Sequence, residues 1–447
     1  MTVARAWSGG RYAVLGLARS GAASVRALVA GGASVVAWDS DPAKRIDPRE
    51  GGGPVAGQSE LGPRLRGGGV EFADLDTIDL AGFDALVVSP GVPLNTHPIA
   101  AKARAANVPI IGDIELFAQA RADLPPHKVV GLTGTNGKST TTALVHHILQ
   151  TAGVPSLMGG NIGLPILGAE PLPAGGVYVL ELSSYQIDLT QTLDCDVAVL
   201  LNVTPDHLDR YANFDTYAAS KARLFAMQSP AHEAVIGIGD DASAAIARSL
   251  SARGESLTKI APGVCMDQSR WPALQGPHNA QNALAAIAVA KALGVAEAAI
   301  DTGLETFNGL PHRMERVATL AGVTYVDDSK ATNPESAAPA LAAFPRVHWI
   351  VGGRAKGDDL DACAPQFDHV VRAYTIGEAG PRFAAVLDGQ VPVEEAGTLD
   401  VAVTRAAARA VRGETVLLSP ACASFDQFAD YAARGLAFRR AVEALAA

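Results

Sequence analysis

The sequence predicts an α/β protein whose parallel β-sheets carry helices on both faces. Two observations predict this class. Short apolar runs recur along the chain, namely RYAVLGL, SVVAWD, DALVVS, VYVLEL, VAVLLNV, HWIVGG and TVLLSP, and turn residues followed by Ala-rich stretches come after each of them. Strands that alternate with helices form βαβ units, in which the strands pair in parallel and are buried on both faces.

The length predicts about three domains. The chain has 447 residues, and roughly 150 residues per domain is the usual proportion. One boundary is expected near residues 111–113, where a strand-like VPIIG precedes a new helix, and the other near residues 308–310, before LPHRM. We therefore expect domains at residues 1–112, 113–309 and 310–447. The glycine-rich segment 51–69 is interpreted as a mobile surface loop rather than a linker.

Composition argues against several classes of partner. A formal net charge of -10 disfavours binding to nucleic acid or to anionic membranes. The four cysteines are far apart and include no CxxC pair, which favours a reducing compartment. The first apolar run is too short for a signal peptide, and no stretch approaches the roughly 18 apolar residues of a membrane span. We expect a cytoplasmic monomer.

The strongest single motif is VVGLTGTNGKSTTTALVHHIL at residues 129–149, a strand, a glycine-containing loop and a helix. Such a loop turns backbone N–H groups toward phosphate, its lysine supplies a positive charge, its serine binds magnesium, and the helix adds its positive N-terminal dipole. Leu132 stands where GxxxxGK[ST] has its first glycine, so the match is to the narrower TGTNGKS. The alternative is a glycine-rich turn with an incidental lysine. The predicted nucleotide-binding residues are Gly134, Thr135, Asn136, Gly137, Lys138, Ser139 and Thr140.

Two further strands end in residues that suit a metal ion. VYVLEL ends at Glu181, and VAVLLNV is followed by TPDHLDRY, which contains His207. Carboxyl ends of parallel strands meet at one edge of a sheet, so both side chains could converge beside Ser139 on a magnesium ion. The alternative is that Glu181 caps a strand end and that His207 is an ordinary satisfied polar residue.

Nine motifs, in order, resemble the motif set of the Mur ligase family. They are TGTNGKST, GGNIG, ELSSYQ, NVTPDHLDRY, HNAQN, GLPHRME, DDSKATNP, GGRAKG and SPACASFDQF. The set spans all three expected domains, and DSKATNP and SPACASFDQF are most similar to the D-glutamate-adding member. The resemblance implies an N-terminal Rossmann-like UDP-binding domain, a central parallel sheet of the P-loop ATPase type and a C-terminal Rossmann-like domain.

The resemblance also implies an activity. Such enzymes use ATP and Mg²⁺ to form an acyl phosphate on a substrate carboxylate, and an amine then displaces the phosphate. Here the implied substrates are UDP-N-acetylmuramoyl-L-alanine and D-glutamate, joined during peptidoglycan precursor synthesis. A carboxylate repels the triphosphate, so cations must gather the two anions and offset the charge that develops during transfer.

The resemblance implies a role for each residue of this sequence that matches a functional position of the family motifs. The implied catalytic residues are Lys138, Glu181, His207, Lys221 and Lys330, and the implied metal ligands are Ser139, Glu181, His207 and Lys221, the last after carbamylation. The implied ATP contacts beyond the loop are Asn279, Asn282, Arg313 and Asp328. D-glutamate is implied to contact Thr332, Lys356, Ser424 and Tyr431. The family often has phenylalanine at the last of these positions, which favours a role through backbone atoms.

The UDP-sugar is implied to lie along the first sheet and the loops after the central strands. The candidate residues are Ser20, Gly21, Asp39, Ser89, Gly91, Asn161 and Ser183. The first strand is followed by GLARSG, in which Ala18 replaces the glycine of a dinucleotide fingerprint, while a diphosphate still suits the helix N-terminus. Four candidates have structural alternatives: Asp39 and Asn161 as turn residues, Lys221 as a solvated helix lysine, and Arg313 as an interdomain salt bridge.

Three other functions compete with this interpretation. A sibling ligase, such as the L-alanine-adding or diamino-acid-adding enzyme or a folylpolyglutamate synthetase, would share the ATP chemistry. A P-loop NTPase that acts as a switch or motor would consume ATP without forming an amide. A nicotinamide oxidoreductase would use the first domain, which the missing glycine disfavours.

Overall fold

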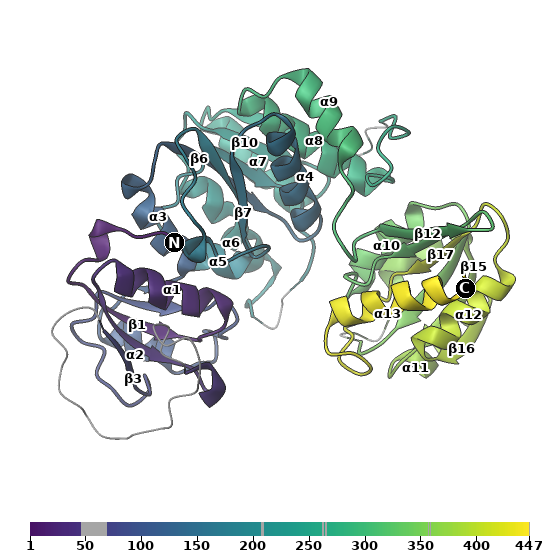
Figure 1. Ribbon diagram of the computed structural model, residues 1–447, viewed down its shortest axis with the longest axis horizontal. Helices are drawn as coiled ribbons and strands as arrows, with labels where there is room; N and C mark the ends of the chain where they lie inside the picture. Colours follow the sequence, from purple (N-terminus) through teal and green to yellow (C-terminus); the bar gives the residue numbers. More distant parts are fainter. Residues whose placement is uncertain are drawn as a thin grey trace. The chain divides into compact units, whose positions relative to one another are not determined.

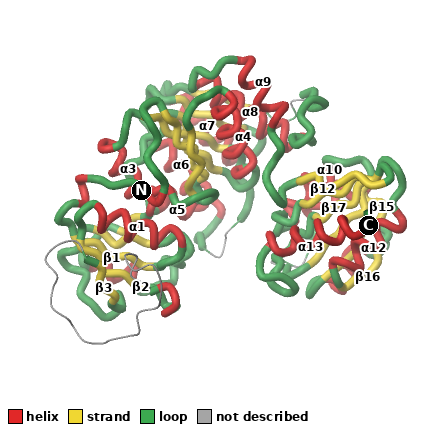
Figure 2. The backbone as a smooth tube through the Cα atoms, in the orientation of Figure 1, coloured by secondary structure: helices red, strands yellow, loops and turns green. Residues whose placement is uncertain are grey.

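The computed structural model describes residues 1–45, 69–206, 210–261, 263, 266–355, 357 and 359–446, and these residues form three β-sheets with flanking helices (Figures 1 and 2). The chain divides into two compact units. The first contains Met1–Ala261 and Ala285–Ile300, and the second contains Pro262–Leu284 and Asp301–Ala447. The glycine-rich segment 51–69 lies outside the described residues except for its last glycine.

The first sheet is wholly parallel and has the order β3-β2-β1-β4-β5. Its strands are β1 (Arg11–Leu15), β2 (Ser34–Trp38), β3 (Val70–Phe72), β4 (Ala85–Val88) and β5 (Ile110–Ile111), and its helices are α1 (Arg19–Ala30) and α2 (Ile99–Ala105). Side chains alternate between the two faces of a strand. In β1, Val14 therefore packs in one core with α1, and Ala13 packs in the opposite core with α2.

The second sheet is also parallel and has the order β11-β10-β9-β6-β8-β7. Its strands are β6 (His127–Thr133), β7 (Ser156–Gly160), β8 (Gly176–Glu181), β9 (Val197–Leu200), β10 (Glu233–Gly237) and β11 (Leu257–Ile260). The helices of this part of the chain are α3 (Asp113–Ala120), α4 (Lys138–Thr151), α5 (Ser184–Asp188), α6 (Phe214–Ala226), α7 (Asp241–Ala252), α8 (Pro277–Ala292) and α9 (Glu297–Thr306). Because β6 lies between β8 and β9, the carboxyl ends of these three strands are adjacent.

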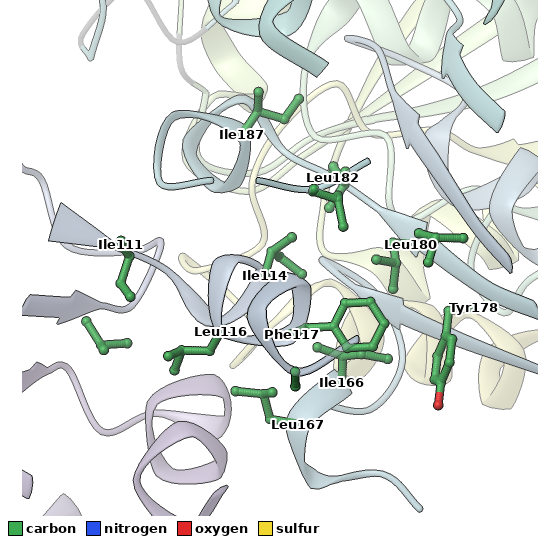
Figure 3. Packing of buried hydrophobic residues seen from close by; sticks show 14 of the residues in the cluster. Ile111, Ile114, Leu116, Phe117, Ile166, Leu167, Tyr178, Leu180, Leu182 and Ile187 are labelled. Carbon is green, nitrogen blue, oxygen red and sulfur yellow. The ribbon is translucent and has the colours of Figure 1, made fainter. Parts of the chain in front are cut away.

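One hydrophobic core joins the first two sheets. Helix α3 contributes Ile114 and Phe117 to it, and the short 3-10 helix η4 (Ile166–Gly168) contributes two more side chains (Figure 3). The ring of Phe117 meets the ring of Tyr178 from β8 edge to face, with centroids 5.0 Å apart. The amide of Thr2 also donates to the carbonyl of Leu167 over 3.0 Å. The first two sheets are therefore packed together as one body.

The third sheet has the order β12-β13-β17-β14-β15-β16. Its strands are β12 (Glu315–Leu320), β13 (Val323–Asp327), β14 (Val347–Gly352), β15 (Val370–Ile376), β16 (Val393–Gly397) and β17 (Thr415–Leu418). Its helices are α10 (Pro334–Ala342), α11 (Gly380–Leu387), α12 (Leu399–Arg409) and α13 (Tyr431–Ala444). In β14, Trp349 faces the core lined by α10 and α11, whereas Ile350 faces the core lined by α12 and α13.

The seven strands predicted from apolar runs are confirmed as β1, β2, β4, β8, β9, β14 and β17. The simple alternation of parallel strands and helices misses one element. Strand β12 pairs antiparallel with β13 through a two-residue turn in which Ala321 and Gly322 have φ of 50° and 83°. Positive φ at both positions is typical of the tight type I′ hairpin. Among the described residues, no helix combines the length and the apolar character needed to cross a bilayer.

We expect Phe117→Ala to destabilise the first unit by about 3–5 kcal/mol, because it removes a fully buried ring and leaves a cavity between the two sheets. Urea unfolding followed by far-UV circular dichroism would measure the loss. The matched control is Leu164→Ala, whose side chain is 68% exposed, and which should change the free energy of unfolding by less than about 0.5 kcal/mol. Equal losses in the two variants would contradict the shared core.

Candidate active site

The phosphate loop, residues 134–140, connects β6 to α4. Gly134 and Gly137 have φ of 155° and 82°, which side-chain-bearing residues rarely adopt. A Cβ added at Gly134 would also lie 3.1 Å from the Cβ of Leu201. No side chain caps the start of α4, and a helix leaves its first N–H groups without intrahelical partners. The sequence thus builds an uncapped helix N-terminus, which is suited to an anion.

Asn202, which follows β9, holds this loop in place. The N–H of Thr135 donates to the backbone carbonyl of Asn202 over 2.9 Å. The side-chain oxygen of Asn202 accepts from the N–H of Asn136 over 2.8 Å. The Asn202 amide donates in turn to the carbonyl of Asn136 over 3.2 Å. The backbone N–H groups of Thr135 and Asn136 are therefore fixed by their hydrogen bonds to Asn202. Sequence reasoning missed Asn202, although it begins the quoted motif NVTPDHLDRY.

Two lysines donate to one carbonyl oxygen at the start of the loop. Lys138 Nζ lies 2.8 Å from the Gly134 oxygen, and Lys221 Nζ, from α6, lies 2.9 Å from the same atom. The Lys221 side chain is only 1% exposed and lies over the ring of Tyr217. Burial, and then the charge of Lys138, hold the pKa of Lys221 well below its usual value. Lys221 therefore loses its proton more readily than an exposed lysine does.

Glu181 ends β8 beside the loop, since it pairs in register with Leu132 of β6. One carboxylate oxygen accepts from the side-chain amide of Asn161 over 2.8 Å, and the Asn161 N–H donates to the Glu181 carbonyl over 2.8 Å. A Cβ at Gly160 would lie 2.2 Å from that carbonyl oxygen, so only glycine fits there. Asn161 and Glu181 are thereby fixed to one another.

The second carboxylate oxygen of Glu181 is buried and has no hydrogen-bond partner within the part of the chain that the structure describes. Burying an unpaired charged oxygen is costly, and such atoms commonly serve as ligands. Ser139, on the first turn of α4, offers a hydroxyl and is 4% exposed. A carboxylate with a hydroxyl is a donor set that suits Mg²⁺. His207, the third predicted ligand, lies outside the described residues.

Ser183 has a structural role of its own. It caps α5, where its hydroxyl accepts from the N–H of Gln186 over 3.2 Å, and the Gln186 side chain bonds back to the Ser183 N–H over 3.1 Å. This reciprocal capping box sets the position of the residues that follow Glu181.

The predicted residues of the first sheet meet around the turn after β1. The hydroxyl of Ser89 donates to the Gly16 carbonyl over 2.7 Å, and a Cβ at Gly21 would lie 1.8 Å from that oxygen. The carboxylate of Asp39 accepts from the N–H of Leu17 over 2.7 Å. Ser89, Gly21 and Asp39 are thus brought together, and the first turn of α1, which contains Ser20, lies beside them.

Asp39 also stabilises the turn that follows β2. Its second oxygen accepts from the N–H of Asp41 over 2.9 Å. Gly91 is linked to the second sheet, because Arg210 donates to its carbonyl over 3.0 Å while stacking over the ring of Tyr185. Arg210 was not predicted, and it connects the first-sheet loop to the motif NVTPDHLDRY.

In the second unit, Asp328 follows β13 and is fully buried. Its two oxygens accept from the hydroxyl of Ser419 over 2.8 Å and from the N–H of Met314 over 3.2 Å. Burial raises the pKa of the Asp328 carboxyl to about 7, against the opposing effects of these hydrogen bonds and of nearby Arg313. Arg313 is therefore close enough to Asp328 to lower its pKa.

The asparagines of HNAQN contact one another on α8. The Asn282 amide donates to the side-chain oxygen of Asn279 over 3.1 Å. Asn279 also borders a pocket whose wall is formed by Pro272, Ala273, Gln275, Asn279, Met314, Arg316, Val326 and Phe344. The wall of this pocket is mostly apolar and also includes the polar side chains of Gln275, Asn279 and Arg316.

Of the residues predicted to contact the amino acid, Tyr431 is joined to Ser329. The hydroxyl of Ser329 donates to the carbonyl of Tyr431 over 2.8 Å, and Lys330 and Thr332 lie one and three residues after Ser329. Ser424 is buried in the loop after β17. Lys356 lies outside the described residues.

Arg434, which sequence reasoning missed, joins these loops. It is 1% exposed and donates to the hydroxyl of Ser329 over 2.9 Å, to the carbonyl of Ser329 over 2.8 Å and to the carbonyl of Cys422 over 3.0 Å. The loops after β13 and β17 are therefore held by one guanidinium, whose fork of donors suits several acceptors at once.

Comparison with known proteins identifies the family. Residues 132–263 match the Mur ligase middle domain, and residues 312–422 match the Mur ligase glutamate ligase domain. The UDP-N-acetylmuramoylalanine--D-glutamate ligase of Novosphingobium aromaticivorans is 61% identical over 100% of this chain and 97% of its own length. The enzymes of the same name from Sphingopyxis alaskensis and Zymomonas mobilis are 59% and 54% identical, with both chains fully covered.

Solved structures agree on the fold. The UDP-N-acetylmuramate-alanine ligase of Thermotoga maritima gives a TM-score of 0.57 at 16% identity, over 98% of this chain and 99% of that one. The MurF ligase of Thermotoga maritima, solved with ADP, gives a TM-score of 0.57 at 18% identity, over 81% and 90%. With relatives above 50% identity over its whole length and both family domains matched, this chain belongs to the Mur ligase family.

Proposed function

We propose that this protein uses ATP to join D-glutamate to UDP-N-acetylmuramoyl-L-alanine, a step of peptidoglycan precursor synthesis. The observation that carries the proposal is the full-length identity of 54–61% to ligases named for that activity. The geometry supports it, because the phosphate loop has beside it two lysines and a buried carboxylate.

The proposed reaction has two steps. A carboxylate oxygen of the alanyl group attacks the γ-phosphorus of ATP, and ADP leaves. The amine of D-glutamate then attacks the acyl carbon and loses a proton, and phosphate leaves with the electrons of the broken C–O bond. The first step brings two anions together, so positive charge at the phosphate loop is its main requirement. Lys138 supplies such a charge at the loop itself.

We propose that Ser139, Glu181, His207 and a carbamylated Lys221 hold the metal. The unpaired Glu181 oxygen and the lowered pKa of Lys221 support this, because carbon dioxide adds only to a neutral amine. When bound, Mg²⁺ would offset negative charge on the phosphates. The carbamate would convert a cationic side chain into an anionic oxygen donor.

The remaining roles are assigned by motif. Asn279, Asn282, Arg313 and Asp328 would contact ATP, and Lys330 would act on the transferred phosphate. Thr332, Lys356, Ser424 and Tyr431 would hold D-glutamate. Ser20, Gly21, Asp39, Ser89, Gly91, Asn161 and Ser183 would hold the UDP-sugar.

We also propose domain limits at residues 1–112, 113–309 and 310–447, each built on one of the three sheets. A cytoplasmic location is proposed as well. The free, buried state of Cys195, Cys363 and Cys422 supports it, since thiols persist in reducing compartments.

The substrate assignment predicts an amino-acid requirement. Purified protein with ATP, Mg²⁺ and UDP-N-acetylmuramoyl-L-alanine should release phosphate only when D-glutamate is added, and mass spectrometry should show the mass of the amide product. Phosphate release with a different amino acid, and none with D-glutamate, would select a sibling ligase. Phosphate release that leaves the UDP-sugar unchanged would instead indicate a nucleotide-hydrolysing switch.

Lys138→Met should lower kcat by at least about 100-fold, because it removes a charge that offsets developing negative charge on the phosphates. The measurement is steady-state phosphate release under the same conditions. Lys291→Met is the matched control, since Lys291 pairs with Glu297 on the surface of the first unit and should retain activity. Full activity in Lys138→Met would remove the phosphate loop from the mechanism.

The burial and the lowered pKa of Lys221 predict that its amine forms a carbamate. Protein equilibrated with ¹³C-bicarbonate should show a carbamate carbon signal by NMR, and the signal should fall as the pH is lowered, because protonation of the amine drives loss of carbon dioxide. Lys221→Met should lose the signal. Lys128→Met, which changes an exposed lysine, should keep it. An unchanged signal in Lys221→Met would place the carbamate elsewhere.

A further inference from the structure

The ammonium group of Lys330 lies against an aromatic face. Its Nζ is 3.8 Å from the centroid of the Tyr431 ring, well within the roughly 6 Å range of a cation–π interaction. The backbone of Lys330 is fixed too, because its N–H donates to the carbonyl of His312 over 3.0 Å. Both ends of the lysine are therefore located by contacts within the second unit.

The ring of Tyr431 is also held in position by contacts within the second unit. Tyr431 is the first residue of α13, whose N-terminus is capped by Asp430. Its carbonyl accepts from the hydroxyl of Ser329, and that hydroxyl accepts from Arg434, one helical turn further along. The ring of His312 meets the Tyr431 ring edge-on, with centroids 6.2 Å apart. The ring of Tyr431 is thus held by a network that includes the buried Arg434.

The carboxylates that precede Lys330 are committed to other partners. Asp327 pairs with His312 over 2.7 Å and accepts from the N–H of Ser329 over 2.9 Å. Asp328 accepts from Ser419 and from Met314. Each of these two carboxyl groups thus has hydrogen-bond partners of its own, while the contact of the Lys330 ammonium is with the ring of Tyr431.

An aromatic partner suits a lysine that must attract phosphate. A carboxylate at the same place would neutralise the ammonium and repel an incoming phosphate. A ring face attracts the cation through its quadrupole, adds no net charge and favours the protonated form. The ring itself therefore does not neutralise the ammonium.

We propose that Tyr431 is a positioning residue whose ring holds the Lys330 ammonium in place for its action on the transferred phosphate. This inference rests on the proposed function, which assigns that action to Lys330. The part played by Tyr431 is electronic as well as steric, and it does not require the phenolic hydroxyl.

Fluorinated phenylalanines test the electronic part directly. Fluorine withdraws π density from the ring while changing its size little, so a series from phenylalanine through mono-, di- and trifluorophenylalanine at position 431 weakens the cation–π contact stepwise. Tyr431→Phe keeps the ring and its face, so its kcat is the reference against which the series is measured. Across the series kcat should fall by about threefold to thirtyfold in total, with unchanged KM for ATP and D-glutamate. Tyr431→Leu should fall at least as far.

The control is the same series at Phe438, which is buried on the same helix and should leave kcat unchanged. A flat series at position 431 together with a loss in Tyr431→Leu would show that the ring only fills space, and would overturn the proposal. A loss in Tyr431→Phe as large as that in Tyr431→Leu would assign the effect to the hydroxyl, and would overturn it equally.

A double-mutant comparison separates this inference from the proposed function. In a Lys330→Met background, fluorination at position 431 should have no further effect on the residual activity. If Lys330→Met itself has full activity, the role of Lys330 in the proposed reaction fails, and the inference fails with it. If Lys330→Met is inactive while the fluorinated series is flat, the inference alone fails.

A second readout does not depend on turnover. The pH dependence of amidination of Lys330, followed by peptide mass mapping, gives the pKa of its amine. We expect that pKa to fall as fluorine is added at position 431, because a weaker quadrupole stabilises the ammonium less. An unchanged pKa across the series would contradict the proposal even if kcat changed.

Discussion

The carbonyl oxygen of Gly134 is the atom on which the phosphate site depends. It accepts from Lys138 and from Lys221, which come from two different helices and converge only because the loop presents that oxygen to both. Burial, and then the charge of Lys138, lowers the pKa of Lys221. The same oxygen therefore brings a lysine of the loop and a buried lysine of α6 to one point. Asn202 maintains this arrangement by fixing the turn that follows.

Both units place their chemistry by the same topological rule, since their functional loops follow the carboxyl ends of adjacent parallel strands. In the first unit, β8, β6 and β9 bring Glu181, the phosphate loop and Asn202 to one edge. In the second, the loops after β13 and β17 carry Asp328 and Ser419. The two sites differ in the group that fixes their loops. The side-chain amide of Asn202 fixes the phosphate loop, and the buried guanidinium of Arg434 fixes the loops of the second unit.

The sequence predicts those parts of the structure that depend on local pattern. Apolar runs located seven of the seventeen strands in the described residues, and the spacing TGTNGKS located the loop, because both are set by neighbouring residues. Asn202 and Arg434 escaped prediction because their partners lie 66 and 105 residues away, and a lone asparagine or a helical arginine has no local signature. Asp39 illustrates the opposite case, since the turn role that sequence left open is present in the structure. The roles given to the site residues stay predictions, and His207 and Lys356 lie outside the described residues.

The continuous core beneath α3 also bears on how this chain can be recombined with its relatives. Phe117, Tyr178 and the η4 side chains form a single interior that serves both the first and the second sheet (Figure 3). A chimera that exchanged only the first sheet would place a relative's apolar side chains against the second sheet of this chain. Those side chains would not pack closely, because interiors are filled to high density by matching shapes. Swaps intended to alter sugar-nucleotide selectivity should therefore transplant both sheets together, with the exchange point placed beyond them.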